Sequence, residues 1–312
     1  MYKIVIVGFG SIGFRYFEAI NKIRLPNIEI FIVDKKIKSL MKHRNLNKRF
    51  IKTLHNLKFI PKKIDLCIIS TTCQNRHTLL KKLIDRSKPK NLILEKPLTQ
   101  SPNELLKLNN ILKNIKNIWV NTDRRCLNIY KFIGSKLNTK NKILMKVEGN
   151  SWGICCNSLH FVDLFSFLSD QYLYIIKEKS SLKWVPAKRS GFKELDEGKL
   201  NLKFGKHELY LSSNKKKNLI KDLKISIKNE KKTFYIKENM NSFELRYNNQ
   251  TLFFKNDPLS VKMTNIIKKI ILENKSNLPN YLNSSKLYYP LINFFLKKWK
   301  TYNPKSIKVP IT

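Results

Sequence analysis

Three glycines near the amino terminus have a spacing that suits contact with phosphate groups. Gly8, Gly10 and Gly13 lie in the run GFGSIG, with Ser11 and Ile12 before the third. The first permits a tight turn, the second lets the backbone approach a pyrophosphate, and the third lets a helix pack closely on the preceding strand. Because a helix N-terminus offers N–H groups and partial positive charge, this run predicts dinucleotide binding. The alternative is a glycine turn without a ligand.

An acidic residue follows the glycine run at the distance that ribose recognition requires. Asp34 lies 21 residues beyond Gly13, directly after the apolar run 28–33. A carboxylate in this place accepts a hydrogen bond from the ribose 2′-hydroxyl of NAD and repels the 2′-phosphate of NADP. The sequence therefore predicts NAD as the cofactor, while Lys35 and Lys36 keep NADP open as the alternative.

A lysine comes at the end of another apolar run. Glu95, Lys96 and Pro97 form the end of NLILEKP. Pro97 restricts the backbone of Lys96 to extended conformations and permits a cis peptide bond. At the carboxyl edge of a parallel sheet, where ligands bind, a lysine can polarise a carbonyl or stabilise an alkoxide. In so lysine-rich a chain, a solvated surface lysine is the alternative interpretation.

Short apolar strands alternate with helical stretches through the first 120 residues. We expect strands at 2–7, 28–33, 64–70, 91–95 and 118–121, helices at 14–23, 78–86 and 101–112, and a basic helical stretch at 37–43. Runs this rich in β-branched residues are typical of strands buried on both faces. They predict a doubly wound parallel sheet, a Rossmann domain, over residues 1–121.

The pattern changes after residue 121. We expect a strand at 142–149, a helix at 157–168, and strands with polar turns over 172–254. Alternation of apolar and polar residues is typical of antiparallel strands with one exposed face. Helices at about 261–273 and 284–297 close the chain. Residues 122–312 are thus expected to form an α+β domain for substrate binding and oligomerisation, built on an open, mainly antiparallel sheet, with the last helix able to pack on the first domain.

The composition is strongly basic, because 62 basic and 22 acidic residues give a formal net charge of +40. The lysines are scattered through every segment, beside abundant Asn and Ile. Three explanations remain open: genome-wide compositional drift, a positive field that gathers anionic substrates such as nucleotide sugars, and nucleic-acid binding. We favour the first and expect no nucleic-acid partner, because no aromatic and basic platform or reader motif is present.

Other compositional features favour a cytoplasmic enzyme. No apolar stretch approaches the roughly 18–20 residues that span a bilayer, and no signal peptide is recognisable, so we expect no membrane partner. The five cysteines are odd in number and include no CxxC pair. We therefore expect reduced thiols, without a disulfide framework or a metal site.

Three motifs together resemble the glucose–fructose oxidoreductase/inositol dehydrogenase (GFO/IDH/MocA) family. They are GFGSIG at 8–13, ILEKPLTQS at 93–101, and segment 152–163, which begins Trp-Gly and ends His-Phe-Val-Asp. The resemblance covers nearly the whole chain and weakens after about residue 170. It implies a Rossmann domain followed by an open-faced sheet domain, NAD(P), and redox chemistry at a carbinol carbon, usually of a sugar or cyclitol. It also implies that Lys96 is a catalytic or nicotinamide-contacting residue.

The resemblance extends to the loop after the third expected strand of the first domain. Thr71, Thr72 and His77 match the family segment that lines the cofactor site. The family's usual proline is missing, since the chain reads Thr-Thr-Cys-Gln-Asn over 71–75. With Glu95 and Lys96, these residues are expected to contribute to cofactor binding.

His160 matches the histidine of the family's second catalytic element. Its near-neutral pKa suits general acid–base work, and Asn157, about one helical turn before it, can orient substrate or ring. Asp163 on the same helical face is expected to cap or pair. Many members have an acid four residues before the histidine and a glycine two before it, but Cys156 and Ser158 stand here. A histidine satisfied in the core is the alternative.

The segment 121–125, with Tyr130, resembles the family segment in which an arginine contacts substrate. Arg124 and Arg125 at a sheet edge can hold an anionic substrate through bidentate hydrogen bonds. Surface charges at a domain junction are the alternative interpretation of this pair.

These expectations combine into one hypothesis and one rival. The hypothesis is an NAD(P)-dependent dehydrogenase or reductase in which hydride passes between nicotinamide and a carbinol or keto carbon, Lys96 holds the oxygen, and His160 exchanges the proton. The expected substrate is a sugar or nucleotide sugar, of the kind used in surface-glycan synthesis, and family analogy predicts a homodimer or homotetramer. The rival is a cofactor-binding regulatory or scaffold protein whose catalytic half has drifted, as Cys156 suggests.

Overall fold

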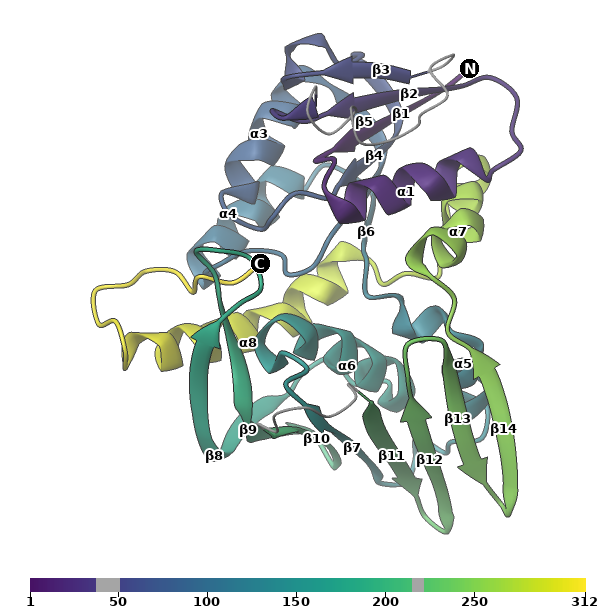
Figure 1. The fold of residues 1–312 in the computed structure, drawn as a ribbon, viewed down its shortest axis with the longest axis vertical. Helices are drawn as coiled ribbons and strands as arrows, with labels where there is room; N and C mark the ends of the chain where they lie inside the picture. Colours follow the sequence, from purple (N-terminus) through teal and green to yellow (C-terminus); the bar gives the residue numbers. More distant parts are fainter. Residues whose placement is uncertain (38–50, 215–221) are drawn as a thin grey trace. The chain divides into compact units, whose positions relative to one another are not determined.

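The computed structural model describes residues 1–37, 51–214 and 222–312, which fall into two compact units (Figure 1). The Rossmann unit comprises Met1–Thr99, Asn103–Asn121 and Pro258–Tyr281, and the mixed-sheet unit comprises Gln100–Pro102, Thr122–Asp257 and Leu282–Thr312. The sequence-based division into 1–121 and 122–312 differs from these units mainly in segment 258–281, which groups with the first unit.

The Rossmann unit is built on a six-stranded sheet in the order β3-β2-β1-β4-β5-β6. Its strands are β1 (Tyr2–Val7), β2 (Ile28–Val33), β3 (Ile51–Leu54), β4 (Lys63–Ile69), β5 (Lys88–Leu94) and β6 (Asn117–Val120). All of the described pairings in this sheet are parallel. The strand order reverses between β1 and β4, and ligands of open α/β sheets bind at such a switch point. The expected doubly wound parallel sheet is confirmed.

Among the described residues, the helices of this part of the fold are α1 (Ser11–Asn21), α3 (Arg76–Arg86), α4 (Pro102–Leu112) and α7 (Leu259–Glu273). The late helix α7 packs against α1, where the Thr264 hydroxyl donates to the carbonyl of Ala19 at 3.4 Å. Met263 and Ile267 of α7 are fully buried. A helix joins the core that covers its apolar face, which explains why segment 258–281 belongs with the Rossmann unit despite its late place in the sequence.

Several short elements go beyond the sequence-based expectation. They are β3, the 3-10 helices η2 (Leu57–Phe59) and η3 (Asp123–Cys126), and the helix α5 (Asn128–Gly134). Strand β3 has only four residues, and none of them is fully buried. Its sequence lacks the apolar run that marked the other strands, so the sequence pattern did not predict it. The helix expected at 37–43 lies outside the described residues from position 38 onward.

The mixed-sheet unit contains an eight-stranded sheet in the order β14-β13-β12-β11-β7-β10-β9-β8. Its strands are β7 (Ile143–Asn150), β8 (Ile175–Pro186), β9 (Lys193–Phe204), β10 (His207–Asn214), β11 (Leu223–Asn229), β12 (Lys232–Glu238), β13 (Ser242–Tyr247) and β14 (Gln250–Lys255). The described pairings are antiparallel except that of β7 with β10, which is parallel. The expected mainly antiparallel sheet is confirmed.

Two helices, α6 (Ile154–Ser169) and α8 (Tyr281–Lys300), lie over one face of this sheet (Figure 1). Phe165 of α6 packs edge to face on Phe204 of β9, with ring centroids 5.1 Å apart. The Tyr174 hydroxyl donates to the carbonyl of Leu287 in α8 at 2.5 Å. Within the described ranges, none of the helices combines the length and apolarity needed to cross a membrane.

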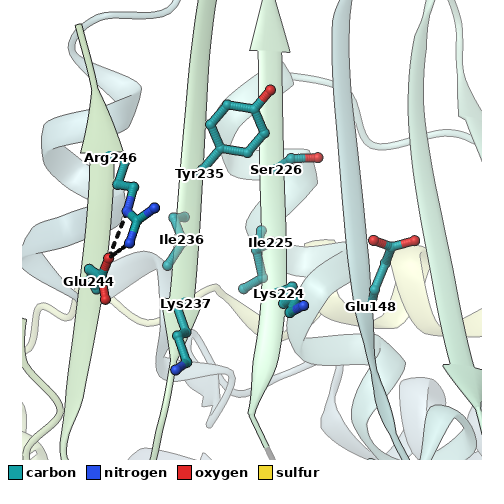
Figure 2. A pocket seen from close by; sticks show the side chains of 9 residues that line it. All are labelled: Glu148, Lys224, Ile225, Ser226, Tyr235, Ile236, Lys237, Glu244 and Arg246. Atoms are coloured by element: carbon teal, nitrogen blue, oxygen red, sulfur yellow. Dashed lines mark hydrogen bonds and ion pairs between the residues drawn. The ribbon is translucent and has the colours of Figure 1, made fainter. Parts of the chain in front are cut away.

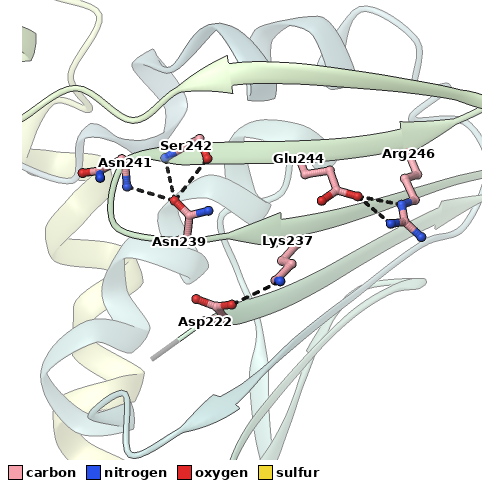
Figure 3. Close-up of polar contacts among 7 residues, drawn as sticks. All are labelled: Asp222, Lys237, Asn239, Asn241, Ser242, Glu244 and Arg246. Carbon is pink, nitrogen blue, oxygen red and sulfur yellow. Dashed lines mark hydrogen bonds and ion pairs between the residues drawn. The ribbon is translucent and has the colours of Figure 1, made fainter. Parts of the chain in front are cut away.

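Polar and charged side chains dominate a shallow hollow of about 310 Å³ on the same sheet. Its lining residues come from β7, β11, β12 and β13, as Figure 2 shows: Glu148, Lys224, Ile225, Ser226, Tyr235, Ile236, Lys237, Glu244 and Arg246. Two ion pairs border it, Glu244 with Arg246 at 2.7 Å and Asp222 with Lys237 at 3.5 Å (Figure 3). These strands therefore bury one side chain and expose the next, as the sequence alternation indicated.

Candidate active site

The glycine run forms the turn between β1 and α1, and two of its glycines are required by close packing. Gly8 has a φ of +92°, and a Cβ there would lie 2.9 Å from the backbone nitrogen of Thr71. A Cβ on Gly13 would lie 2.0 Å from the carbonyl oxygen of Gly8. Helix α1 therefore approaches the end of β1 more closely than any side chain allows.

Gly10 has a different environment from its two partners. A Cβ placed there would meet no atom within 4 Å, and the residue is the N-cap of α1. Ser11 and Ile12 after it are exposed. The first turn of α1 thus faces open space with its N–H groups and partial positive charge. This cradle, which a side chain would partly fill, fits the diphosphate of a dinucleotide.

Asp34 directly follows β2 and is tied to the glycine turn. Its Oδ2 accepts a hydrogen bond from the backbone N–H of Phe9 at 2.7 Å, and its Oδ1 accepts one from that of Lys36 at 2.8 Å. A carboxylate oxygen can accept two hydrogen bonds, so each still has capacity for a hydroxyl. The acid therefore stands beside the turn with a fixed orientation, as ribose recognition requires.

The loop after β4 is held against the same turn. Ser70 donates its hydroxyl to the carbonyls of Val7 and Gly8 at 3.1 and 2.7 Å. Thr71 is the neighbour that would collide with a Cβ on Gly8, and Thr72 is half-buried. The structure thus brings Thr71, the glycines and Asp34 to one edge of the sheet.

His77 has nearby partners of its own within the Rossmann unit. It lies in α3, where its Nδ1 is 3.9 Å from a carboxylate oxygen of Glu104 in α4. Its Nε2 is 3.2 Å from the hydroxyl of Thr78. These contacts give His77 a role in the α3–α4 packing, and its place at the cofactor remains a prediction.

Glu95 is buried at the end of β5 and joins three elements. Its Oε1 accepts from the Tyr16 hydroxyl of α1 and from the Asn121 amide after β6, both at 2.6 Å. Burial raises the pKa of Glu95, while these two hydrogen bonds and the positive charges of Lys96 and Arg76 oppose the rise. Its carboxyl group thus fixes α1 relative to the ends of β5 and β6. The half-buried Lys96 follows it, and the Lys96–Pro97 peptide bond is cis.

Arg76 is a functional candidate that the sequence analysis missed. Its side chain is 1% exposed, although arginine is rarely buried. Its Nη1 donates to the carbonyls of Glu95, Pro97 and Leu98, and its Nη2 donates to the carbonyl of Thr71 at 2.7 Å. One guanidinium therefore holds the loop that carries Lys96 and the loop that meets the glycine turn. In a chain with 62 basic residues, nothing in the sequence distinguished this arginine from a solvated one.

In the mixed-sheet unit, α6 carries the expected histidine near its first turn. The helix begins after Gly153, whose φ is +76°. Asn157 donates its amide to the carbonyl of Trp152 at 2.6 Å, which ties it to the chain entering the helix. His160 is half-buried and lies nearly one turn further along. The two residues thus share a helical face, as their spacing predicted.

Arg124 and Arg125 are both bound by carboxylates of their own unit. Arg124 makes a bidentate pair with Glu238 at 2.7 and 3.0 Å, and its guanidinium lies 4.2 Å from the ring centroid of Phe161. Arg125 binds the two oxygens of Asp163 at 2.8 and 2.6 Å. Burial raises the pKa of Asp163 to about 6, against the effect of Arg125. Two N–H donors of each guanidinium therefore already bind a carboxylate of the protein. We revise the expectation that the two arginines bind an anionic substrate.

Comparison with known proteins supports the Rossmann architecture of the first unit. Residues 2–122 match the GFO_IDH_MocA family, described as an oxidoreductase family with an NAD-binding Rossmann fold. The Rossmann region is therefore similar to this oxidoreductase family. The match confirms the resemblance seen in the motifs and the expected class of cofactor, NAD or NADP. None of the curated proteins matches the chain in sequence.

Three solved structures share the fold over nearly their whole length. A dehydrogenase (MviM) from Clostridium difficile has a TM-score of 0.68 at 17% identity, over 95% of this chain and 99% of that one. Biliverdin reductase from Synechocystis, in complex with biliverdin and NADP+, has 0.65 at 13%, over 95% and 98%. A super-repressor mutant of Gal80p from Saccharomyces cerevisiae has 0.69 at 14%, over 96% of each chain. At these identities the likeness shows the fold alone.

Replacing the two glycines of the α1 turn by alanine separates packing from binding. We expect Gly13→Ala to lower the free energy of unfolding by about 1–3 kcal/mol, because its methyl group collides with the Gly8 carbonyl. Gly10→Ala should leave stability within about 0.5 kcal/mol and weaken NADH binding instead. Urea unfolding and fluorescence titration measure the two effects. Equal stability losses in the two variants would contradict this assignment.

Arg76 is expected to be critical for stability. Arg76→Met removes the donor of three buried carbonyls and one half-buried carbonyl, and it should lower the free energy of unfolding by about 3–5 kcal/mol. Arg76→Lys keeps the charge but not the planar fork, so its loss should be smaller but measurable. Lys81→Met on the exposed face of the same helix is the matched control, with less than about 0.5 kcal/mol expected. A control-sized loss in Arg76→Met would overturn the clamp.

Proposed function

We propose that this oxidoreductase is a dehydrogenase or reductase that acts on a carbinol or keto carbon of a sugar or nucleotide sugar, with NAD preferred over NADP. The observation that carries the proposal is the open cradle at Gly10, bordered by the oriented carboxylate of Asp34. A glycine turn at a helix N-terminus would by itself suit any phosphate. The added acid favours a ribose with free hydroxyl groups.

In this proposal the Rossmann unit binds and orients the dinucleotide. The N–H groups at Ser11 and Ile12 hold the diphosphate, Asp34 accepts from the ribose, and Thr71 and Thr72 line the same edge. A bound nicotinamide supplies or accepts a hydride, and the protein contributes position and charge. Lys96 then donates a hydrogen bond from its Nζ to the substrate oxygen, so that negative charge developing there is stabilised.

The proton is assigned to the mixed-sheet unit. His160 would accept the hydroxyl proton in oxidation and return it in reduction, since imidazole titrates near neutral pH. Asn157 would hold the substrate or the turn of α6 that carries the His160 imidazole. Because Arg124 and Arg125 are paired within the protein, recognition of an acidic or nucleotide-linked substrate would depend on lysines and on the net charge of +40.

A second candidate function is regulation without turnover. The fold is shared with a super-repressor mutant of Gal80p, and position 156 carries a cysteine instead of the acid common in the family. In this reading the Rossmann unit binds a dinucleotide as a signal, and the mixed-sheet unit binds a protein partner. Turnover of a sugar distinguishes the two candidates, because the regulator would bind cofactor but transfer no hydride.

Cofactor titration tests the main proposal. We expect the purified protein to bind NADH more tightly than NADPH in fluorescence titrations. Asp34→Ala should weaken NADH binding about tenfold and bring the affinities for NADH and NADPH closer together. Lys96→Ala should lower kcat/KM for a sugar substrate by a much larger factor than it weakens NADH binding. Asp85→Ala, an exposed acid in α3, is the control. Absence of binding for both cofactors would reject the oxidoreductase proposal.

We also propose, by family analogy, a cytoplasmic homodimer or homotetramer that assembles through the hollowed sheet face of Figure 2. Each copy carries a net charge of +40, so the two copies repel each other at low salt, and salt that screens this repulsion should favour assembly. Light scattering at micromolar concentration should give at least twice the monomer mass at about 150 mM salt. Tyr235→Asp should shift the protein toward monomer. A monomer at that salt concentration would contradict the proposal.

A further inference from the structure

A carboxylate from β9 lies at the N-terminus of α6. Glu194 Oε1 accepts from the backbone N–H of Cys155 at 2.7 Å and of Leu195 at 2.8 Å, and both of its oxygens are 3.2 Å from the backbone nitrogen of Cys156. The Cys156 thiol is a further hydrogen-bond partner. A side chain distant in sequence therefore caps the helix that carries His160.

The groups that hold the Glu194 carboxylate are neutral. Its contacts with the helix are backbone N–H groups and a thiol. Within the part of the chain that the structure describes, no lysine or arginine is paired with it, whereas Asp163 of α6 and Glu238 of β12 each bind an arginine. Burial raises the pKa of Glu194, and its hydrogen bonds act in the opposite direction. The N-terminal partial charge of α6 also favours the ionised form.

Helix geometry connects this carboxylate with His160. Side chains on a helix lean toward its N-terminus, so a residue covers the turn before its own Cα. Cys156 and His160 are four residues apart and share one face, with Cβ atoms roughly 6 Å apart. Cys156 is a hydrogen-bond partner of Glu194, and helical side-chain direction turns His160 toward the same end of α6. We therefore expect the carboxylate to lie about one helical turn from the imidazole.

We propose that Glu194 is a positioning residue for proton exchange: it fixes the first turn of α6, and through Cys156 its charge favours the protonated form of His160. The inference rests on the proposed function, in which His160 exchanges the substrate proton. It places on β9 the carboxylate that position 156 of α6 lacks. The strand thereby supplies a charge that the sequence of the helix does not show.

Other charged groups face α6 and must be separated from this effect. Asp123, Arg124 and Arg125 approach from η3, and Asp163 belongs to the helix itself. Arg125 pairs with Asp163, and Arg124 pairs with Glu238, so these charges largely cancel. Glu194 remains as an acid on the N-terminal side of His160, and its effect is separated from that of Asp123 by replacing Glu194 alone. Because the carboxylate favours imidazolium, its removal lowers the pKa of His160.

An NMR titration of the imidazole protons in the full chain tests the proposal without cofactor or substrate. His160→Gln assigns the resonance among the five histidines. We expect Glu194→Gln to lower the pKa of His160 by about half a unit or more. Glu197→Gln, an exposed acid on the same strand that pairs with Lys183, should leave it unchanged. An unchanged His160 pKa in folded Glu194→Gln would overturn the proposal.

A relocated acid provides the rescue. Adding Cys156→Asp to Glu194→Gln returns a carboxylate to the face of His160. We expect the pKa of His160 to rise again, and the low-pH limb of kcat/KM for oxidation to return toward that of the parent protein.

Glu194→Asp is the second variant if Glu194→Gln does not fold. It keeps the charge on a shorter side chain and should hold the pKa of His160 within about 0.3 unit of the parent value. A shift as large as that expected for Glu194→Gln would overturn the proposal. A pKa shift without any cofactor binding would reject the oxidoreductase and leave the Glu194–His160 coupling intact.

Discussion

The close approach of α1 to the end of β1 is the constraint on which the candidate site depends. Gly13 lies so near the Gly8 carbonyl that a single methyl group would force the two elements apart. That contact leaves the N-terminus of α1 directed at open space beside Gly10. Asp34 and the loop at Thr71 are then held against the same turn. Binding groups from separate strands thereby converge without a ligand to order them.

Two buried charged residues maintain this convergence by bonding to the chain itself. Arg76 uses its guanidinium on carbonyls of two loops, and Glu95 joins α1 to the ends of β5 and β6. A buried ion without partners is costly, so each is held firmly by its hydrogen bonds. The loop that carries Lys96 is consequently set by interior contacts, and the lysine itself is left half-buried. Glu95 thus stabilises the fold, and the neighbouring Lys96 is the residue proposed to contact substrate.

The mixed-sheet unit shows how pairing changes the meaning of a motif. Arg124 and Arg125 are the residue types expected to bind an anion, yet Glu238 and Asp163 bind them instead. Cys156 suggested the loss of an acid, yet Glu194 brings a carboxylate to it from β9. In both cases the partner lies tens of residues away, and one helix or strand cannot reveal it. Electrostatic roles therefore follow from the fold.

The sequence alone determined the parallel sheet, the glycine turn and the place of Asp34, because these features depend on local periodicity and on backbone freedom within about 35 residues. It also determined the class of cofactor. The tertiary structure decided that segment 258–281 joins the Rossmann unit, that Arg76 is buried, and that Glu194 caps α6. These features depend on contacts between distant segments. Among so many lysines and arginines, only burial distinguishes a charge that holds the fold from one that meets the solvent.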